Sequence, residues 1–176
     1  MQLKLMTMML ESPPMAKRTG FYPACERDYL EPLQMLKGWV DHLIFCDIRH
    51  VPHGHVALRE LSATIHNKEL PEASFFLGDA LSALTCLKPV DVFFLRRDSG
   101  GEGGSGLYLL GSDRLALSLN LIKPGGMLIT DERNGFGWLP KLKSGELLDY
   151  QVGNRNITLS ASQPWKAHGL FAMQVS

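Results

Sequence analysis

The sequence of 176 residues has no excess of charge of either sign, because its 18 lysines and arginines balance its 18 aspartates and glutamates. No global positive field therefore exists to attract nucleic acid or an anionic membrane surface. Long hydrophobic runs are also missing. The apolar stretch at the start is too short and interrupted for a secretory signal, and no later run approaches the length of a membrane span. We therefore expect a soluble, cytoplasmic protein with neither a nucleic-acid nor a membrane partner.

Cysteine is scarce, and its number is odd. Cys25, Cys46 and Cys86 cannot build the disulfide framework of a small secreted protein, so we expect reduced thiols. A chain of this length with 45% hydrophobic residues can bury a core without such crosslinks. Linkers, repeats and low-complexity tails are missing as well. We therefore predict a single domain over residues 1–176, in which residues 1–16 form a flexible or peripheral segment.

Apolar runs of strand length alternate with segments of helical periodicity over most of the chain. Strands are predicted at residues 18–22, 43–46, 74–77, 91–95 and 127–130. Helices are predicted at about 26–37, around 57–65, at about 81–87 and at 107–122. Parallel neighbours need crossover connections, which place helices on the faces of the sheet. The alternation therefore predicts a doubly wound, mostly parallel α/β sheet.

The last third of the chain has a different pattern. Residues 147–152 and 156–160 flank Gly153-Asn154, a pair that favours a tight hairpin turn, and residues 169–175 form one more predicted strand. We therefore predict that the sheet ends in an antiparallel C-terminal hairpin.

Three short motifs lie in order along this pattern. Lys123-Pro124-Gly125-Gly126-Met127-Leu128 precedes the fifth strand, Asp47 ends the second, and Gly78-Asp79-Ala80 follows the third. Together they resemble the class I S-adenosylmethionine-dependent methyltransferases, whose fold is a Rossmann-like three-layer sandwich. The resemblance implies S-adenosylmethionine as cofactor. It also implies a ribose contact at Asp47, a further cofactor contact at Ile48, and adenine contacts at Gly78, Asp79 and Ala80.

The first loop departs from this family, which carries glycines there. It reads Tyr22-Pro23-Ala24-Cys25-Glu26-Arg27-Asp28, and its alanine and cysteine disfavour the positive φ angles that glycine allows. The resemblance still places Tyr22, Ala24, Cys25 and Asp28 against the methionine part of the cofactor. Glu26 and Asp28 lie near the N-terminus of the predicted helix, where carboxylates are favourable and could cap the helix or receive the ammonium group of the cofactor. We interpret Cys25 as a small, half-buried residue rather than as a nucleophile.

Polar residues follow the fourth predicted strand, at an edge where open α/β sheets bind their ligands. Arg96, Asp98 and Ser99 are therefore candidates for substrate contact, with a charged, solvated loop as the alternative. No catalytic residue can be assigned from the sequence. A general base is optional in methyl transfer, and Asp98 or His50 could only be guessed for that role.

Two further patterns indicate other chemistry. The histidines at positions 50, 53 and 55 crowd one loop, but their spacing matches no tight metal signature, so we predict a solvated loop or substrate rim and no metal site. Residues 101–106 match the dinucleotide-binding motif G-x-G-x-x-G, with Asp131 beyond the next strand. Five residues separate that motif from the strand, whereas a turn that binds pyrophosphate lies tight against the strand end. The separation therefore disfavours NAD(P) or FAD as the cofactor.

Two hypotheses remain open from the sequence. In the first, the chain is a methyltransferase that acts on a small molecule or protein, in which the protein chiefly aligns the reactants and excludes water. In the second, it is an inactive relative that keeps the fold for binding or assembly. Neither the substrate nor the oligomeric state can be read from these residues.

Overall fold

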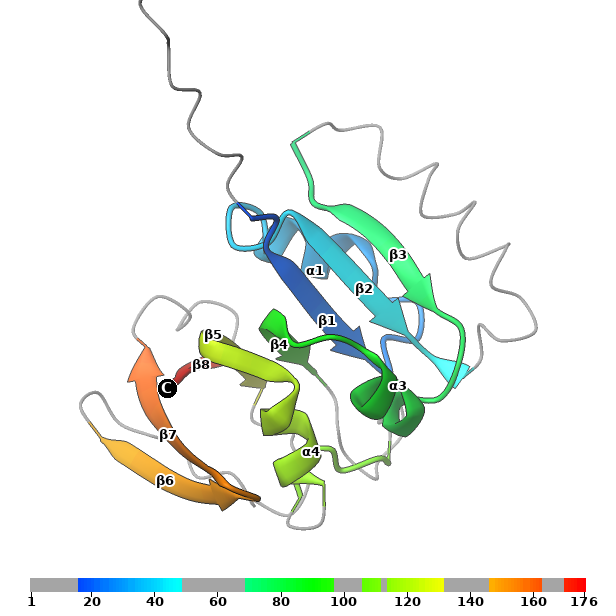
Figure 1. Cartoon of the computed structure of the whole chain (residues 1–176). Helices are drawn as coiled ribbons and strands as arrows, with labels where there is room; N and C mark the ends of the chain where they lie inside the picture. Colours follow the sequence, from blue (N-terminus) through cyan, green and yellow to red (C-terminus); the bar gives the residue numbers. More distant parts are fainter. Residues whose placement is uncertain (1–15, 49–68, 97–105, 112–113, 132–145, 163–169) are drawn as a thin grey trace, which may run out of the picture.

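The computed structural model describes residues 16–48, 69–96, 106–111, 114–131, 146–162 and 170–176 (Figure 1). The described strands form one sheet of eight strands in the order β3-β2-β1-β4-β5-β8-β7-β6. They are β1 (Thr19–Pro23), β2 (His42–Cys46), β3 (Glu72–Phe76), β4 (Val90–Leu95), β5 (Ile122–Asp131), β6 (Leu147–Val152), β7 (Arg155–Ser162) and β8 (Leu170–Val175). The described helices are α1 (Leu30–Met35), α3 (Ala80–Cys86) and α4 (Leu115–Asn120).

The sheet has a parallel part and an antiparallel part, as the sequence pattern predicts. Strands β3, β2, β1, β4 and β5 pair in parallel, and β8, β7 and β6 continue the sheet in antiparallel pairs. The chain runs outward from β1 to β3 and then returns to place β4 on the other side of β1. This reversal creates a switch point between β1 and β4, where open α/β sheets bind ligands at the carboxyl ends of the strands.

The predicted hairpin is present between β6 and β7. Val152 pairs with Arg155, which leaves Gly153 and Asn154 as a turn of two residues. Gly153 has a φ of +59°, a left-handed angle that such turns require and that glycine adopts without steric cost.

Two buried clusters of side chains lie on opposite faces of the sheet, because successive residues of a strand point to opposite sides. Phe93 belongs to the cluster that includes residues of α3 and α4, whereas its neighbour Phe94 belongs to the cluster that includes residues of α1. Figure 1 agrees, with α3 and α4 in front of the sheet and α1 behind β1 and β2. No helix within the described residues is long and apolar enough to cross a membrane.

Helix α1 is shorter than the predicted 26–37 and begins at Leu30. Pro32 explains the late start, because its ring would clash with the carbonyl of residue 28 if that residue were already helical. Proline is tolerated in the first turn, where it lies here. The N-cap residue is Tyr29, which makes no side-chain capping bond, so neither Glu26 nor Asp28 occupies the N-cap position.

Helix α4 is also shorter than predicted, because the helical periodicity of 107–122 extends over non-helical residues. Tyr108 has a φ of +49°, which is incompatible with a right-handed helix, and helical structure begins only at Leu115. At the other end, Ile122 already pairs with Val90 in the sheet. The Lys-Pro-Gly-Gly segment then forms an irregularity inside β5, since the next pair joins Val92 to Met127.

Candidate functional site

The loop after β1 adopts the backbone conformation that the sequence disfavours. Ala24 and Glu26 have φ angles of +51° and +49°, in the left-handed region. This conformation costs a residue other than glycine roughly 1–2 kcal/mol. Two hydrogen bonds to the end of β2 hold the loop: the Cys25 amide donates to the Cys46 carbonyl at 3.1 Å, and the Glu26 amide donates to Asp47 at 2.8 Å. The loop therefore keeps a glycine-like shape without glycines.

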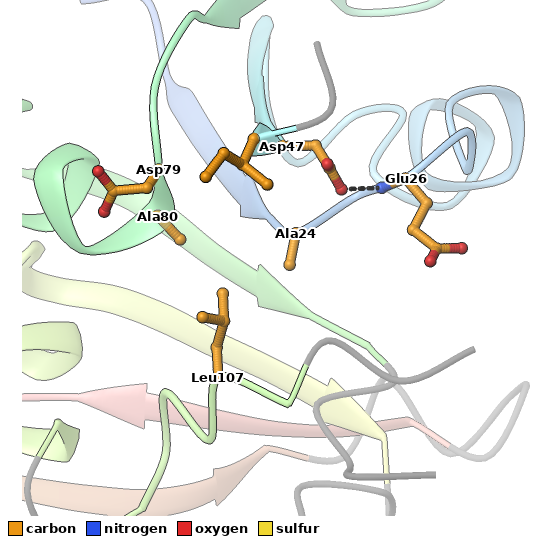
Figure 2. A pocket seen from close by; sticks show the side chains of 7 residues that line it. Ala24, Glu26, Asp47, Asp79, Ala80 and Leu107 are labelled. Atoms are coloured by element: carbon orange, nitrogen blue, oxygen red, sulfur yellow. Dashed lines mark hydrogen bonds between the residues drawn. The ribbon is translucent and has the colours of Figure 1, made fainter. Parts of the chain in front are cut away.

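Asp47 directly follows β2 and is buried, with 6% of its surface exposed. Its Oδ2 is the atom that accepts the Glu26 amide, a charge-assisted hydrogen bond across 21 residues of sequence. Figure 2 shows this carboxylate directed toward the Glu26 backbone. Asp47 therefore positions the first loop, in addition to lining the pocket described below.

Asp79 follows β3 and is the N-cap of α3. Its Oδ1 accepts from the Ser82 amide at 2.9 Å, and its Oδ2 accepts from the Ser82 hydroxyl at 2.5 Å. These two hydrogen bonds hold the pKa of the Asp79 carboxyl below its ordinary value. In Figure 2 the carboxylate points away from Ala24 and Leu107. The structure thus gives Asp79 the capping role that aspartate often has at this position.

A pocket lies at the carboxyl edge of the sheet, with a volume of about 130 Å³. Its lining comes from the ends of successive parallel strands, and the residues are Ala24, Glu26, Asp47, Ile48, Asp79, Ala80 and Leu107. Figure 2 shows Ala24 and Leu107 facing each other across it. Three of the lining residues are acidic and none is basic. This lining favours a cationic or hydroxyl-rich ligand over one that carries phosphate.

Three other predicted site residues meet on the α1 side of the first loop. The Tyr22 hydroxyl donates to Asp28 at 2.9 Å, and the Arg96 guanidinium lies 3.3 Å from the same carboxylate oxygen. Arg96 also donates to Glu31 at 2.8 Å. The Arg96 and Asp28 side chains are only 14% and 12% exposed. Burial, together with the charge of Asp28, raises the pKa of the Tyr22 hydroxyl far above its usual value.

This network joins the first loop to α1 and to the end of β4. Its members are absent from the lining of the pocket. The predicted cofactor and substrate residues are therefore divided between a pocket and a buried ion-pair network. A substrate role for Arg96 stays a prediction.

Cys25 is fully buried, not half-buried, with 1% exposure, and Cys46 beside it is 0% exposed. Burial, reinforced by the nearby charge of Asp47, raises the pKa of both thiols, that of Cys46 to about 12. A thiol that stays protonated is a poor nucleophile, in agreement with the interpretation of Cys25 as a packing residue. Gly78 contributes its carbonyl, which accepts a hydrogen bond from the Cys46 thiol at 3.3 Å.

Several candidates lie outside the described residues: Asp98, Ser99, the three histidines at 50, 53 and 55, and residues 101–105 of the glycine-rich motif. Sequence reasoning missed one residue of the pocket, Leu107, which was assigned to a helix. No local signal in the sequence marks Leu107 as a pocket residue, because its place there depends on tertiary structure. Glu26 was interpreted as a cap or an ammonium ligand, and its place in the pocket depends on its left-handed backbone angle.

The fold and the site together define a doubly wound α/β protein with an acidic and apolar pocket at the carboxyl edge of its parallel strands. Neither family models nor curated protein sequences match the chain. Solved structures do match. An rRNA methylase from Streptococcus thermophilus is 11% identical with a TM-score of 0.49, and the alignment covers 91% of this chain and 87% of that one.

Two other matching structures are of enzymes with different activities. A spermidine synthase is 14% identical with a TM-score of 0.46, and 93% of this chain aligns with 53% of that one. A precorrin 8W decarboxylase from Methanobacterium thermoautotrophicum is 15% identical with a TM-score of 0.45, covering 91% of this chain and 81% of that one. Identities this low carry no function to this chain. Its own strand order, five parallel strands with an antiparallel ending, is that of a methyltransferase-like fold.

Proposed function

We propose that this chain binds S-adenosylmethionine in the pocket at the carboxyl edge and transfers its methyl group to a small-molecule or protein acceptor. The proposal rests on the agreement between the sequence motifs, which assign residues to the cofactor, and the pocket lining in the structure. Five residues assigned to the cofactor from sequence motifs, Ala24, Asp47, Ile48, Asp79 and Ala80, line one pocket beside the switch point of the sheet.

The charge of the pocket supports this cofactor over a dinucleotide. S-adenosylmethionine carries a sulfonium cation and no phosphate, whereas NAD(P) and FAD carry a pyrophosphate. Within the described lining, Glu26, Asp47 and Asp79 are acidic and no residue is basic. Such a lining attracts the sulfonium and repels the pyrophosphate. We therefore propose dinucleotide binding only as the less supported alternative.

The apolar residues of the pocket suit the adenine base. Ile48 is 65% exposed at the end of β2 and presents an apolar surface to the pocket. Leu107 supplies a second apolar surface in the same pocket. The volume of about 130 Å³ is below the usual range for pockets that enclose drug-sized ligands. The pocket therefore accommodates one part of the cofactor, and we assign that part to the nucleoside.

When bound, S-adenosylmethionine supplies the activated methyl group, so the protein needs few catalytic side chains. The residues of this chain would hold the nucleoside and exclude water, which aligns the reactants. We also propose that the chain is one domain and a three-layer sandwich. Buried clusters on both faces of the sheet support the layers.

A binding protein without methyltransferase activity is the second candidate. The first loop favours it, because Ala24 and Glu26 replace glycine at left-handed positions and their side chains occupy space beside the ligand. Transfer of a labelled methyl group to acceptors in a cell extract distinguishes the two candidates, provided that binding itself has been established.

Titration calorimetry with S-adenosylhomocysteine, and with NADH as comparator, tests the binding proposal. We expect saturable binding of the first compound only. Ile48→Ala should weaken that binding about tenfold, because the apolar contact that it removes contributes roughly 1.4 kcal/mol, which corresponds to a factor of ten in affinity. Leu77→Ala is the matched control, because Leu77 is similarly exposed at the end of β3 but does not line the pocket. Equal losses in both variants, or binding of NADH instead, would refute the assignment.

A further inference from the structure

The geometry points to Arg96 as a positioning residue for the nucleoside pocket, which holds the first loop in place through Asp28 and does not touch the ligand. This inference rests on the proposed function and departs from the sequence prediction, which makes Arg96 a substrate contact. It follows from where the Arg96 side chain lies and from how the first loop is built.

Arg96 bridges the switch point of the sheet. It directly follows β4, and its guanidinium lies 3.3 Å from Asp28 in the loop after β1 and 2.8 Å from Glu31 in the first turn of α1. The Tyr22 hydroxyl, at the end of β1, donates to the same Asp28 oxygen at 2.9 Å. Because the Arg96 and Asp28 side chains are only 14% and 12% exposed, removing either charge would leave the other buried and uncompensated.

The loop that contains Asp28 forms one wall of the pocket. Ala24 lines the pocket from this loop and faces Leu107 across it (Figure 2). Ala24 and Glu26 both have left-handed φ angles, which persist only where surrounding contacts impose them. The Asp28 amide donates to the Cys25 carbonyl at 2.9 Å, so Asp28 is tied to the middle of the same turn. A shift of Asp28 would therefore move the wall that Ala24 forms.

Loss of the Arg96 charge should displace this wall. The Asp28 carboxylate would stay buried without its cation, and it would relieve that cost by turning toward water and drawing the loop with it. A ligand binds only those molecules whose loop is in place, so its affinity falls in proportion to their fraction. If about one molecule in ten keeps the loop in place, binding weakens about tenfold. The loss should be equal for every ligand that occupies the pocket with the same nucleoside.

Titration calorimetry with adenosine and with S-adenosylhomocysteine tests the inference, because the two compounds share the nucleoside and differ in the amino-acid tail. In Arg96→Met we expect both to bind about tenfold more weakly than in the wild-type protein. Adding Asp28→Asn should restore part of both affinities, because it removes the stranded charge and its amide oxygen can still accept the Tyr22 hydroxyl. Lys123→Met is the matched control. It removes the cation 2.8 Å from Asp91, near the start of β4, and should leave both affinities unchanged.

The outcomes separate this inference from the proposed function. A loss confined to S-adenosylhomocysteine, or one that Asp28→Asn does not relieve, would show that Arg96 touches the ligand; the inference would then be overturned while nucleoside binding stands. Unchanged affinities in Arg96→Met, or an equal loss in Lys123→Met, would overturn it as well. No binding of either compound to the wild-type protein overturns both proposals.

A second variant keeps the test decisive if Arg96→Met does not fold. Tyr22→Phe removes only the hydroxyl that donates to Asp28, so the change to the network is smaller. We expect it to weaken both compounds equally, by about threefold. A loss for one compound alone, or no loss, would overturn the inference.

Discussion

Replacing Arg96 by methionine tests how strongly the ion-pair network holds the first loop to α1 and β4. The change keeps most of the aliphatic volume but leaves the Asp28 carboxylate, 12% exposed, without the guanidinium at 3.3 Å. Breaking a buried pair by removing one partner costs about 3–5 kcal/mol. The bond to Glu31 adds less than about 1 kcal/mol, because that side chain is 49% exposed. We take about 3 kcal/mol as the expected loss in unfolding free energy.

For a chain of this length, such a loss corresponds to a melting temperature lower by about 6–12 °C. Thermal unfolding followed by circular dichroism measures it. Lys37→Met is the matched control, since the Lys37–Glu69 pair is 49% and 69% exposed and should contribute at most about 1 kcal/mol. Adding Asp28→Asn to Arg96→Met should restore part of the stability, because it removes the stranded charge. The reasoning fails if Arg96→Met costs no more than Lys37→Met.

Three further predictions follow from local geometry. Ala24→Gly should raise the unfolding free energy by about 0.5–1 kcal/mol, because the backbone strain that glycine removes at this left-handed position exceeds the entropic cost of glycine. A loss of stability in urea unfolding would show that Ala24 is not strained. Burial lowers the pKa of His42 below 6.5, so the folded state takes up this proton less readily than the unfolded state. The free energy of unfolding should therefore fall as the pH drops below 6.5. Urea unfolding across that pH range measures this dependence, which His42→Gln should flatten. A thiol reagent should label Cys86 in the native protein and reach Cys25 and Cys46 only after unfolding, whereas rapid native labelling of all three would show the burial to be wrong.

Much of the sheet was predictable because its strands are continuous apolar runs. Phe93 and Phe94 face opposite clusters, so β4 is buried on both faces of the sheet. A continuous apolar run is typical of such a buried parallel strand. The hairpin was equally visible, because Gly153 is the kind of residue that a turn of two residues requires. Strand existence and hairpin geometry are local properties, so local sequence suffices to identify them.

The helix boundaries and the site geometry were less accessible, because they depend on contacts between distant residues. Periodicity alone extended α1 to residue 26, although the ring of Pro32 prevents helix so far upstream. Motifs placed Asp47 in the pocket but could not show that its carboxylate accepts the amide of Glu26. The left-handed conformation of Ala24 runs against its own preference and is imposed by the surrounding structure.

The central claim is that the pocket at the carboxyl edge holds the nucleoside of S-adenosylmethionine. A crystal structure of the protein grown with saturating S-adenosylhomocysteine tests it most directly. We predict density for adenosine in contact with Ile48 and Leu107. A saturated crystal with the ligand bound elsewhere, or with this pocket empty, would contradict the claim.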